Sequence, residues 1–346
     1  MPPGGLVFYN PRLGAKPGIL IPRKEDNMAR FGITLSNGHC LRWVIASGGL
    51  AFDGRGYWFE RPLLWSGRIK PKLFIVAVKT LTMSPKRGNL KWWKRFGGCV
   101  RLLDKRGQAL NELEILFSPH RIDGIVNAVG LTNSGFLAWA KKWQDQYRYY
   151  GYKIIISVMP TDIAEAKTMA QTISCLAKQN PELIAAAELN PSCPNCIGKH
   201  QLRTNSDEVT MLALVFKQYC PNLPLLLKVG PQQDYLTIAE NLSGVVEAIS
   251  FNSVPWDMVF PDQPSPLNYL GVNGGISGKL AQPILWPMVQ SLVQQGIIPA
   301  IGPSVWDFPD ISSLLWEMGA SAIHFGAIHL RGLQGPTLPT RYVKQW

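Results

Sequence analysis

The sequence predicts an α/β fold, a closed (β/α)8 barrel, and three observations lead to this prediction. Short apolar, β-branched runs recur along the 346-residue chain, and most of them end in a small or polar residue. These runs lack strict alternation, which is typical of strands buried on both faces in a parallel sheet. Stretches long enough for crossover helices separate them, so strand and helix alternate as a parallel α/β fold requires.

Nine runs are candidate strands. In chain order they are 42–48 (RWVIASG), 73–80 (LFIVAVKT), 124–130 (GIVNAVG), 153–159 (KIIISVM), 183–190 (LIAAAELN), 223–230 (LPLLLKVG), 246–253 (VEAISFNS), 297–303 (IIPAIGP) and 321–327 (SAIHFGA). A barrel needs eight strands. Because Asn and Gly interrupt the run at 124–130, we expect it to be a loop at the barrel mouth.

Crossover helices are predicted at 162–179, 206–220 and 281–296. The rival architecture is an open, doubly wound sheet, which would more often show a Gly-rich fingerprint after its first strand. The segment ASGGLAFDGRG is rich in Gly but lacks the G-x-G-x-x-G spacing, which favours the barrel.

One barrel domain is expected over residues 39–346. Residues 1–38 are rich in Pro and Gly and have no periodicity, so they form a predicted N-terminal extension that packs on the barrel or is partly disordered. The stretch 81–123 is long for a connection, and we expect it to cover one end of the barrel.

The composition limits the partners and the location. The net charge of +12 favours anionic ligands, and the basic cluster 86–95 contains two Trp, but no nucleic-acid-binding motif accompanies it. No run of 18 apolar residues and no signal-peptide core is present, and the six cysteines do not form a disulfide framework. We therefore expect a cytoplasmic protein that binds neither nucleic acid nor a membrane.

Polar residues end several predicted strands. In a barrel, such residues point into the active site at the carboxyl ends of the strands. They are Ser47, Lys79, Asn190, Lys228 and Asn252, with Asn127 on the neighbouring loop. Two lysines and three amides predict a pocket for an anion and for a ring with both hydrogen-bond donors and acceptors.

Three glycine-bearing segments near the end of the chain are candidates for a phosphate grip. Backbone N–H groups after the last strands of a barrel commonly bind phosphate. The candidate residues are Gly274, Gly275, Gly302, Ser304, Gly326 and Ala327. A phosphorylated cofactor or substrate is the expected ligand, and ordinary turns are the alternative.

Cys193 and Cys196 form a C-x-x-C pair. A structural zinc site needs four ligands, and the other cysteines are isolated. Haem attachment needs His after the second Cys, where this chain has Ile197, and a thioredoxin-type pair begins a helix, whereas this one lies among loop-forming residues. We therefore predict no metal and a single activated thiol, Cys193, just past a strand end.

The segment ELNPSCPNCIGK resembles the active-site loop of the dihydroorotate dehydrogenases. Further blocks that resemble this family in the same order are IASG, VKTLTMSPKRGN, IVNAVGLTNSGF, LLKVG, FNS, GGISG and GASAIHFGA, so the resemblance spans about residues 42–330. It implies an FMN-containing barrel that oxidises dihydroorotate to orotate in pyrimidine synthesis. A cysteine base implies the soluble class 1, and CPNxxGK with Lys199 is more similar to the homodimeric, fumarate-using subclass 1A than to 1B.

The resemblance also implies a role for each matched position. Cys193 would be the base, with Lys79 as a second catalytic residue. Substrate contacts are implied for Asn127, Gly130, Leu131, Asn190, Asn195, Asn252 and Ser253. FMN contacts are implied for Ala46, Ser47, Gly48, Lys79, Thr80, Asn190 and Lys228, and for the phosphate-grip candidates named above.

Several positions depart from the family pattern. Pro303 stands where a Gly is usual and removes one N–H donor, and Ala327 stands where a Thr or Ser hydroxyl is common. Cys196 replaces an expected aliphatic residue. Two other functions therefore stay open: a flavin barrel acting on another dihydropyrimidine, and a catalytically idle barrel kept for binding.

Overall fold

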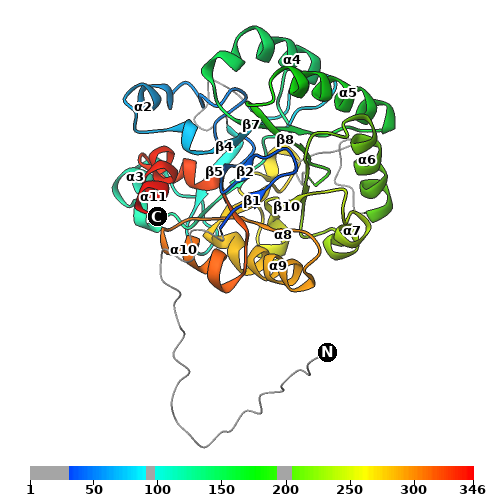
Figure 1. Cartoon of the computed structure of the whole chain (residues 1–346). Helices are drawn as coiled ribbons and strands as arrows, with labels where there is room; N and C mark the ends of the chain where they lie inside the picture. The colour runs from blue at the N-terminus through cyan, green and yellow to red at the C-terminus, as the bar shows by residue number, and fades with distance from the viewer. Residues whose placement is uncertain (1–30, 91–97, 193–204) are drawn as a thin grey trace, which may run out of the picture. The chain divides into compact units, whose positions relative to one another are not determined.

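Eight parallel strands form a barrel, as predicted. The structure is a computed structural model and describes residues 31–90, 98–192 and 205–346 (Figure 1). The barrel strands are β3 (Trp43–Ile45), β4 (Ile75–Ala77), β7 (Ile154–Val158), β8 (Ile184–Leu189), β9 (Leu225–Val229), β10 (Ala248–Phe251), β13 (Ile301–Gly302) and β14 (Ala322–Phe325). Their order is β10-β9-β8-β7-β4-β3-β14-β13, and a parallel bridge between Ile249 and Ala300 joins the two ends.

Helices surround the strands (Figure 1). They are α2 (Arg61–Trp65), α3 (Glu112–Phe117), α4 (Phe136–Asp145), α5 (Ile163–Gln179), α6 (Ser206–Tyr219), α7 (Tyr235–Asn241), α8 (Trp256–Val259), α9 (Gln282–Gln295), α10 (Pro309–Ser312) and α11 (Leu338–Gln345). Short 3-10 turns follow β14 at Ala327–Leu330 and Gly335–Thr337. The three predicted crossover helices are confirmed as α5, α6 and α9.

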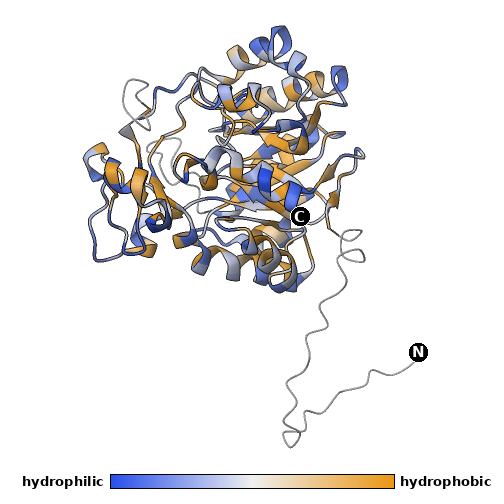
Figure 2. Cartoon of the chain, turned by 90° about the vertical axis from the view of Figure 1, so that its left-hand side faces the viewer, coloured by the Kyte–Doolittle hydropathy of each residue, from blue (hydrophilic) through white to orange (hydrophobic). Residues whose placement is uncertain are grey.

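Helix α5 illustrates why these segments are helical. The Asp162 carboxylate caps its first turn by accepting from the Glu165 N–H at 2.8 Å. Apolar residues at spacings of three and four, including Ala166, Ala170 and Ile173, are buried against the barrel. Figure 2 shows the matching pattern, with apolar residues concentrated on the strands and both kinds of residue on the helices.

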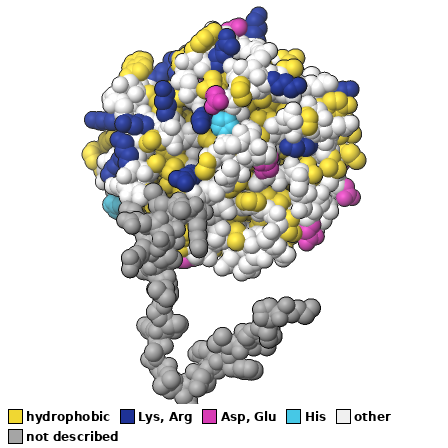
Figure 3. All heavy atoms as spheres, viewed as in Figure 1, with side chains coloured by type: hydrophobic (Ala, Val, Ile, Leu, Met, Phe, Trp, Pro, Cys, Tyr) yellow, Lys and Arg dark blue, Asp and Glu magenta, His cyan; other side chains and the backbone are white. Residues whose placement is uncertain are grey.

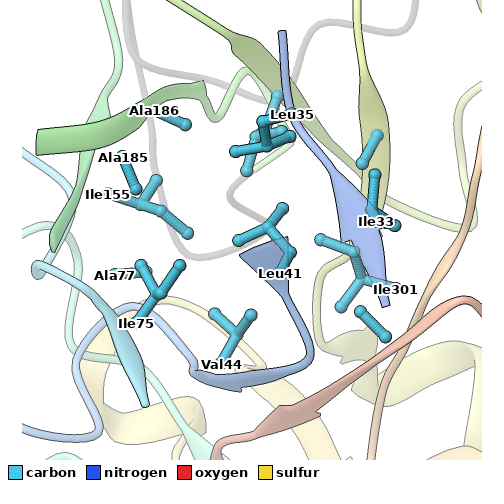
Figure 4. Packing of buried hydrophobic residues seen from close by; sticks show 13 residues of the cluster. Ile33, Leu35, Leu41, Val44, Ile75, Ala77, Ile155, Ala185, Ala186 and Ile301 are labelled. Carbon is cyan, nitrogen blue, oxygen red and sulfur yellow. The ribbon is translucent and has the colours of Figure 1, made fainter. Parts of the chain in front are cut away.

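A short hairpin fills the amino end of the barrel. Strands β1 (Ile33–Thr34) and β2 (Cys40–Leu41) pair antiparallel. Ile33, Leu35 and Leu41 belong to one buried cluster with residues of several barrel strands, such as Val44 and Ile75 (Figure 4). Within the predicted extension, Ile33 and Leu35 therefore contribute to the barrel core, whereas residues 1–30 lie outside the described residues.

A second, antiparallel sheet lies at the other end. Its order is β11-β12-β6-β5, with β5 (Val100–Leu103), β6 (Gly124–Asn127), β11 (Val254–Pro255) and β12 (Gly275–Gly278). The prediction of a loop at 124–130 was therefore wrong for its first four residues. They form a strand because β12, far away in the sequence, pairs along them from Gly278↔Gly124 to Gly275↔Asn127.

No helix among the described residues is long and apolar enough to cross a membrane. Lys and Arg side chains are spread over the face drawn in Figure 3, with fewer Asp and Glu between them, in keeping with the net charge of +12.

Candidate functional site

A cavity of about 870 Å³ opens at the carboxyl ends of the barrel strands. Its volume lies within the range of about 300–1,000 Å³ that is usual for small-molecule sites. The predicted site residues that line it are Ala46, Ser47, Gly48, Lys79, Thr80, Asn127, Gly130, Leu131, Asn190, Lys228, Asn252, Ser253, Ser304, Gly326 and Ala327. The structure therefore brings together the polar strand ends that the sequence singled out.

Thr80 is the centre of a hydrogen-bonded cluster on one wall. Its hydroxyl lies 3.0 Å from that of Ser47 and 2.9 Å from that of Ser157, and its backbone N–H donates to the Ser47 hydroxyl. The Asn190 amide donates to the same Thr80 oxygen at 2.9 Å. These bonds link the ends of β3, β4, β7 and β8, so each side chain is held in one orientation before any ligand binds.

Asn190, Ser192 and Asn252 form a second cluster on the adjacent wall. The Asn252 amide donates to the Asn190 side-chain oxygen at 3.2 Å and to the Ser192 backbone oxygen at 3.0 Å. The Ser192 hydroxyl donates to the Lys228 backbone oxygen at 2.8 Å. The chain is thus fixed to the barrel directly before residue 193.

Beneath these residues lies an ion pair that the sequence reasoning missed. Lys228 Nζ lies 2.9 Å from the Glu188 carboxylate, and both side chains are almost fully buried. The Ser157 and Ser250 hydroxyls donate to the same carboxylate at 2.7 and 3.1 Å. Glu188 is two residues before Asn190 on the same face of β8, so the period-two rule for strands could have identified it.

Opposing effects act on the pKa of the Glu188 carboxyl. Burial raises that pKa, but the Lys228 ammonium, followed by His324 and the hydrogen bonds, outweighs burial, and the net shift is downward. Burial, reinforced by Lys228, lowers the pKa of His324 to about 3. The interior therefore holds a carboxylate at Glu188 and a neutral imidazole at His324 at neutral pH.

Three glycines predicted to grip phosphate are not among the residues that line the cavity: Gly274, Gly275 and Gly302. Gly274 has φ +85°, and a Cβ there would lie 2.8 Å from Val126 Cγ2 and 2.9 Å from the Asn127 backbone oxygen. Gly302 packs closely against Leu314 and Ala320. All three therefore have clear packing or pairing roles in the fold.

The loop after β13 is held rigidly. Ser304 has φ +60°, and its backbone oxygen accepts from the Gln282 amide at 2.9 Å. The Asp310 carboxylate accepts from the same amide and from the N–H groups of Trp306 and Asp307. Together with Gly326 and Ala327 after β14, this loop is the wall that could hold an anionic group.

Cys193, Asn195, Cys196 and Lys199 lie outside the described residues. Among the described residues, Cys99 is buried near Lys79, and burial raises the pKa of its thiol to about 11 even though Lys79 lowers it. No group of three His, Cys, Asp or Glu within the described ranges could hold a metal ion.

Comparisons with known proteins point to one enzyme family. The family model for dihydroorotate dehydrogenase matches residues 118–326. The chain is 23% identical over 206 residues to the catalytic subunit of dihydroorotate dehydrogenase B (NAD(+)) from Maridesulfovibrio salexigens, covering 59% of this chain and 66% of that protein. It is 29% identical over 215 residues to dihydroorotate dehydrogenase A (fumarate) from Lactobacillus delbrueckii subsp. bulgaricus, covering 60% of this chain and 67% of that one.

Solved structures show the same fold. The ligand-free dihydroorotate dehydrogenase of Eimeria tenella superposes with a TM-score of 0.60 at 15% identity, covering 94% of this chain and 89% of that one. The ferulenol complex of the same protein gives 0.61 at 14% identity, covering 91% and 83%. The chain spans about two thirds or less of several curated relatives, down to 58%. Since the family model matches more than half of the chain, the protein belongs to the dihydroorotate dehydrogenase family.

Proposed function

We propose that the protein is an FMN-dependent enzyme that oxidises dihydroorotate to orotate in pyrimidine biosynthesis. The observation that carries the proposal is the set of amide and ammonium groups at the strand ends. Asn127, Asn190 and Asn252 line the same cavity as Lys79 and Lys228. A pyrimidine ring with a carboxylate needs this combination of donors, acceptors and positive charge.

The residues present fit a flavin mononucleotide. A buried lysine, Lys228, lines the cavity, and so do Ser304 and Gly326, whose loops would bind an anion. When bound, FMN would accept the hydride that leaves the substrate. Ser47, Thr80 and Lys228 would hold its ring, and the loop at Ser304 its phosphate. Pro303 donates no N–H, so neighbouring backbone groups would supply those bonds.

The protein groups would then handle the proton. Cys193 would remove a proton from the carbon next to a ring carbonyl, while the asparagines orient the ring. Its loop starts at Ser192, which the Lys228 backbone oxygen and Asn252 fix in place. Lys79, 9% exposed, would lower the pKa of a nearby thiol and bind the substrate carboxylate.

Further parts of the proposal rest on the resemblance to subclass 1A. We propose fumarate as the electron acceptor, a homodimer as the assembly and the cytoplasm as the location. Steady-state rates with fumarate, NAD and a quinone test the acceptor: the highest kcat/KM is expected for fumarate, and a preference for either rival would exclude it.

The purified protein tests the reaction itself. Bound FMN should give a flavin absorbance spectrum, and anaerobic dihydroorotate should bleach it. A protein without flavin that added FMN does not restore would contradict the proposal. Bleaching by dihydrouracil but not by dihydroorotate would assign it to another dihydropyrimidine.

Cys193→Ala tests the proposed base. Loss of a positioned base typically slows the proton-transfer step by about 10²–10⁴-fold. We expect flavin reduction by dihydroorotate to slow by that factor in a stopped-flow experiment. The control is Cys175→Ala, because Cys175 is exposed on α5. An unchanged rate in Cys193→Ala would remove this residue from the role.

A further inference from the structure

A chain of hydroxyl groups connects the buried Glu188 carboxylate to the cavity. The Ser157 hydroxyl lies 2.7 Å from that carboxylate. The Thr80 hydroxyl lies 2.9 Å from that of Ser157, and the Ser47 hydroxyl lies 3.0 Å from that of Thr80. Ser47 and Thr80 line the cavity, whereas Ser157 and Glu188 are buried. Each hydroxyl carries one proton, so the bonds of the chain can run in either of two directions.

The Glu188 carboxylate determines this direction. Burial raises the pKa of its carboxyl, but Lys228, with His324 and the hydrogen bonds, outweighs burial, so the group is ionised at neutral pH. An ionised carboxylate only accepts hydrogen bonds. Ser157 must therefore donate to Glu188, and Thr80 must donate to Ser157. The charge at one end of the chain thus fixes the position of the Thr80 proton.

Asn190 brings a second donor to Thr80. The Asn252 amide donates to the Ser192 backbone oxygen, which can only accept, so the same nitrogen of Asn252 faces the Asn190 side-chain oxygen. The nitrogen of the Asn190 amide is therefore the atom that faces Thr80, and it donates to the Thr80 hydroxyl oxygen at 2.9 Å. The orientation of this amide thus agrees with a Thr80 oxygen that accepts on the cavity side.

Ser47 is the last group of the chain. Since Thr80 donates its one proton to Ser157, the bond between Ser47 and Thr80 must be donated by Ser47. The Ser47 oxygen also accepts from the Thr80 backbone N–H at 3.0 Å. A hydroxyl oxygen has two lone pairs, so Ser47 has one of them left and no proton to give. Toward a ligand in the cavity, Ser47 is therefore an acceptor.

We propose that Glu188 is a positioning residue that keeps Ser47 a hydrogen-bond acceptor toward the cofactor. Its negative charge acts through Ser157 and Thr80. Ser47 then selects a ligand group with an N–H, and the ring of oxidised FMN carries such a group. Without the chain, the Thr80 proton would turn to Ser47, whose own proton would face the ligand N–H. The inference rests on the proposed binding of FMN.

Ser157→Ala tests the chain and keeps the ion pair of Glu188 and Lys228 intact. Its matched control is Ser250→Ala, because both serines are fully buried and donate to Glu188, whereas Ser157 also bonds Thr80. Equilibrium dialysis of the full-length holoprotein, followed by flavin fluorescence, gives the dissociation constant of FMN. It should rise about tenfold in Ser157→Ala, the value of one hydrogen bond, and stay at the native value in Ser250→Ala.

A double-mutant cycle with Ser47→Ala locates the effect. If the chain acts through Ser47, Ser157→Ala should change the affinity for FMN little in the Ser47→Ala background, and the two losses should be less than additive. A merely structural role of Ser157 would weaken FMN binding equally in both backgrounds. Additive losses in the cycle, or equal FMN affinities of Ser157→Ala and Ser250→Ala, would overturn the inference.

The same measurements separate this inference from the proposed function. A native protein that binds FMN tightly, together with equal affinities in the two serine variants, would overturn the inference alone. A native protein without affinity for FMN would overturn the proposed function and this inference together.

Discussion

The side chains of Glu188 and Lys228 form an ion pair that is almost fully buried beneath the site. Both charges are removed from water, so each depends on the other and on the hydroxyls of Ser157 and Ser250. Replacing such a pair with apolar residues is often tolerated, but removing one partner leaves a buried charge uncompensated.

Glu188→Gln should therefore lower the free energy of unfolding by about 3–5 kcal/mol at pH 7. Urea denaturation measures the change. The control is Glu182→Gln, at an exposed position just before the same strand, which should have little effect. The double variant Glu188→Gln/Lys228→Met should regain most of the loss. Equal stability of Glu188→Gln and Glu182→Gln would contradict this account.

His324 should make stability depend on pH. Its pKa is about 3 in the folded protein and 6.5 ordinarily, so between these values the unfolded chain binds more protons and stability falls as pH falls. The uptake of this one proton by the unfolded chain should lower the free energy of unfolding by about 2 kcal/mol between pH 7 and pH 5. The contribution of Glu188 to stability is lost only below its ordinary pKa of 4.5, because the pKa of its carboxyl is lowered in the folded protein.

His324→Gln isolates this contribution. Urea denaturation of this variant should show a smaller fall in stability between pH 7 and pH 5 than the native protein does. His120→Gln, at an exposed position, should keep the native pH dependence. A parallel pH dependence in all three proteins would mean that His324 is protonated when folded.

At the scale of elements, β6 and β12 form a support for the site. Asn127 reaches the cavity from the end of β6, and its amide donates to the Gly275 backbone oxygen at 3.2 Å, across 148 residues of sequence. Gly274 allows the two strands to approach, because its φ is +85° and the space beside it is filled.

Gly274→Ala should therefore lower the free energy of unfolding by more than backbone strain alone would. Gly271→Ala is the matched control: its φ is +75°, but nothing lies within 4 Å of a Cβ there. In the control, the strain of a left-handed Ala should lower the free energy of unfolding by about 1–2 kcal/mol. In Gly274→Ala, overpacking should lower it by about 1–3 kcal/mol more. Only Gly274→Ala should also weaken dihydroorotate binding, measured by flavin bleaching. Equal effects would show that the contact with Asn127 is relaxed.

For the whole molecule, the two ends of the barrel have different tasks. The β1–β2 hairpin fills the amino end, and the cavity lies at the carboxyl end. Leu41→Ala should lower the free energy of unfolding by about 2–5 kcal/mol, since Leu41 is fully buried. Thermal denaturation measures this, with Leu137→Ala at a half-exposed position of α4 as control. Flavin reduction should stay unchanged in both variants, and a slower rate in Leu41→Ala would show that the ends are coupled.

Much of this architecture could be predicted from the sequence, for a physical reason. Parallel strands buried on both faces appear as continuous apolar runs, and their last polar residues point into the site. The eight barrel strands and the convergence of Lys79, Asn190 and Asn252 follow from these two rules. Contacts between distant segments do not: the pairing of β6 with β12, and the approach of His329 to Glu60, depend on the closed fold. Glu188 was missed because only strand-end residues were considered.

The closure of the barrel has a further consequence. Seven pairs of neighbouring barrel strands are joined by hydrogen-bond ladders. In contrast, β10 and β13 are joined by an isolated bridge between Ile249 and Ala300. Thermal fluctuations should therefore separate β10 from β13 before the other strand pairs. The amide protons at this contact should exchange with solvent faster than those of β8. Pro303 and Ser304 follow β13 directly. An anion bound to this loop would stabilise the contact between β10 and β13. Slower amide hydrogen exchange in these two strands would then indicate that the anion is bound.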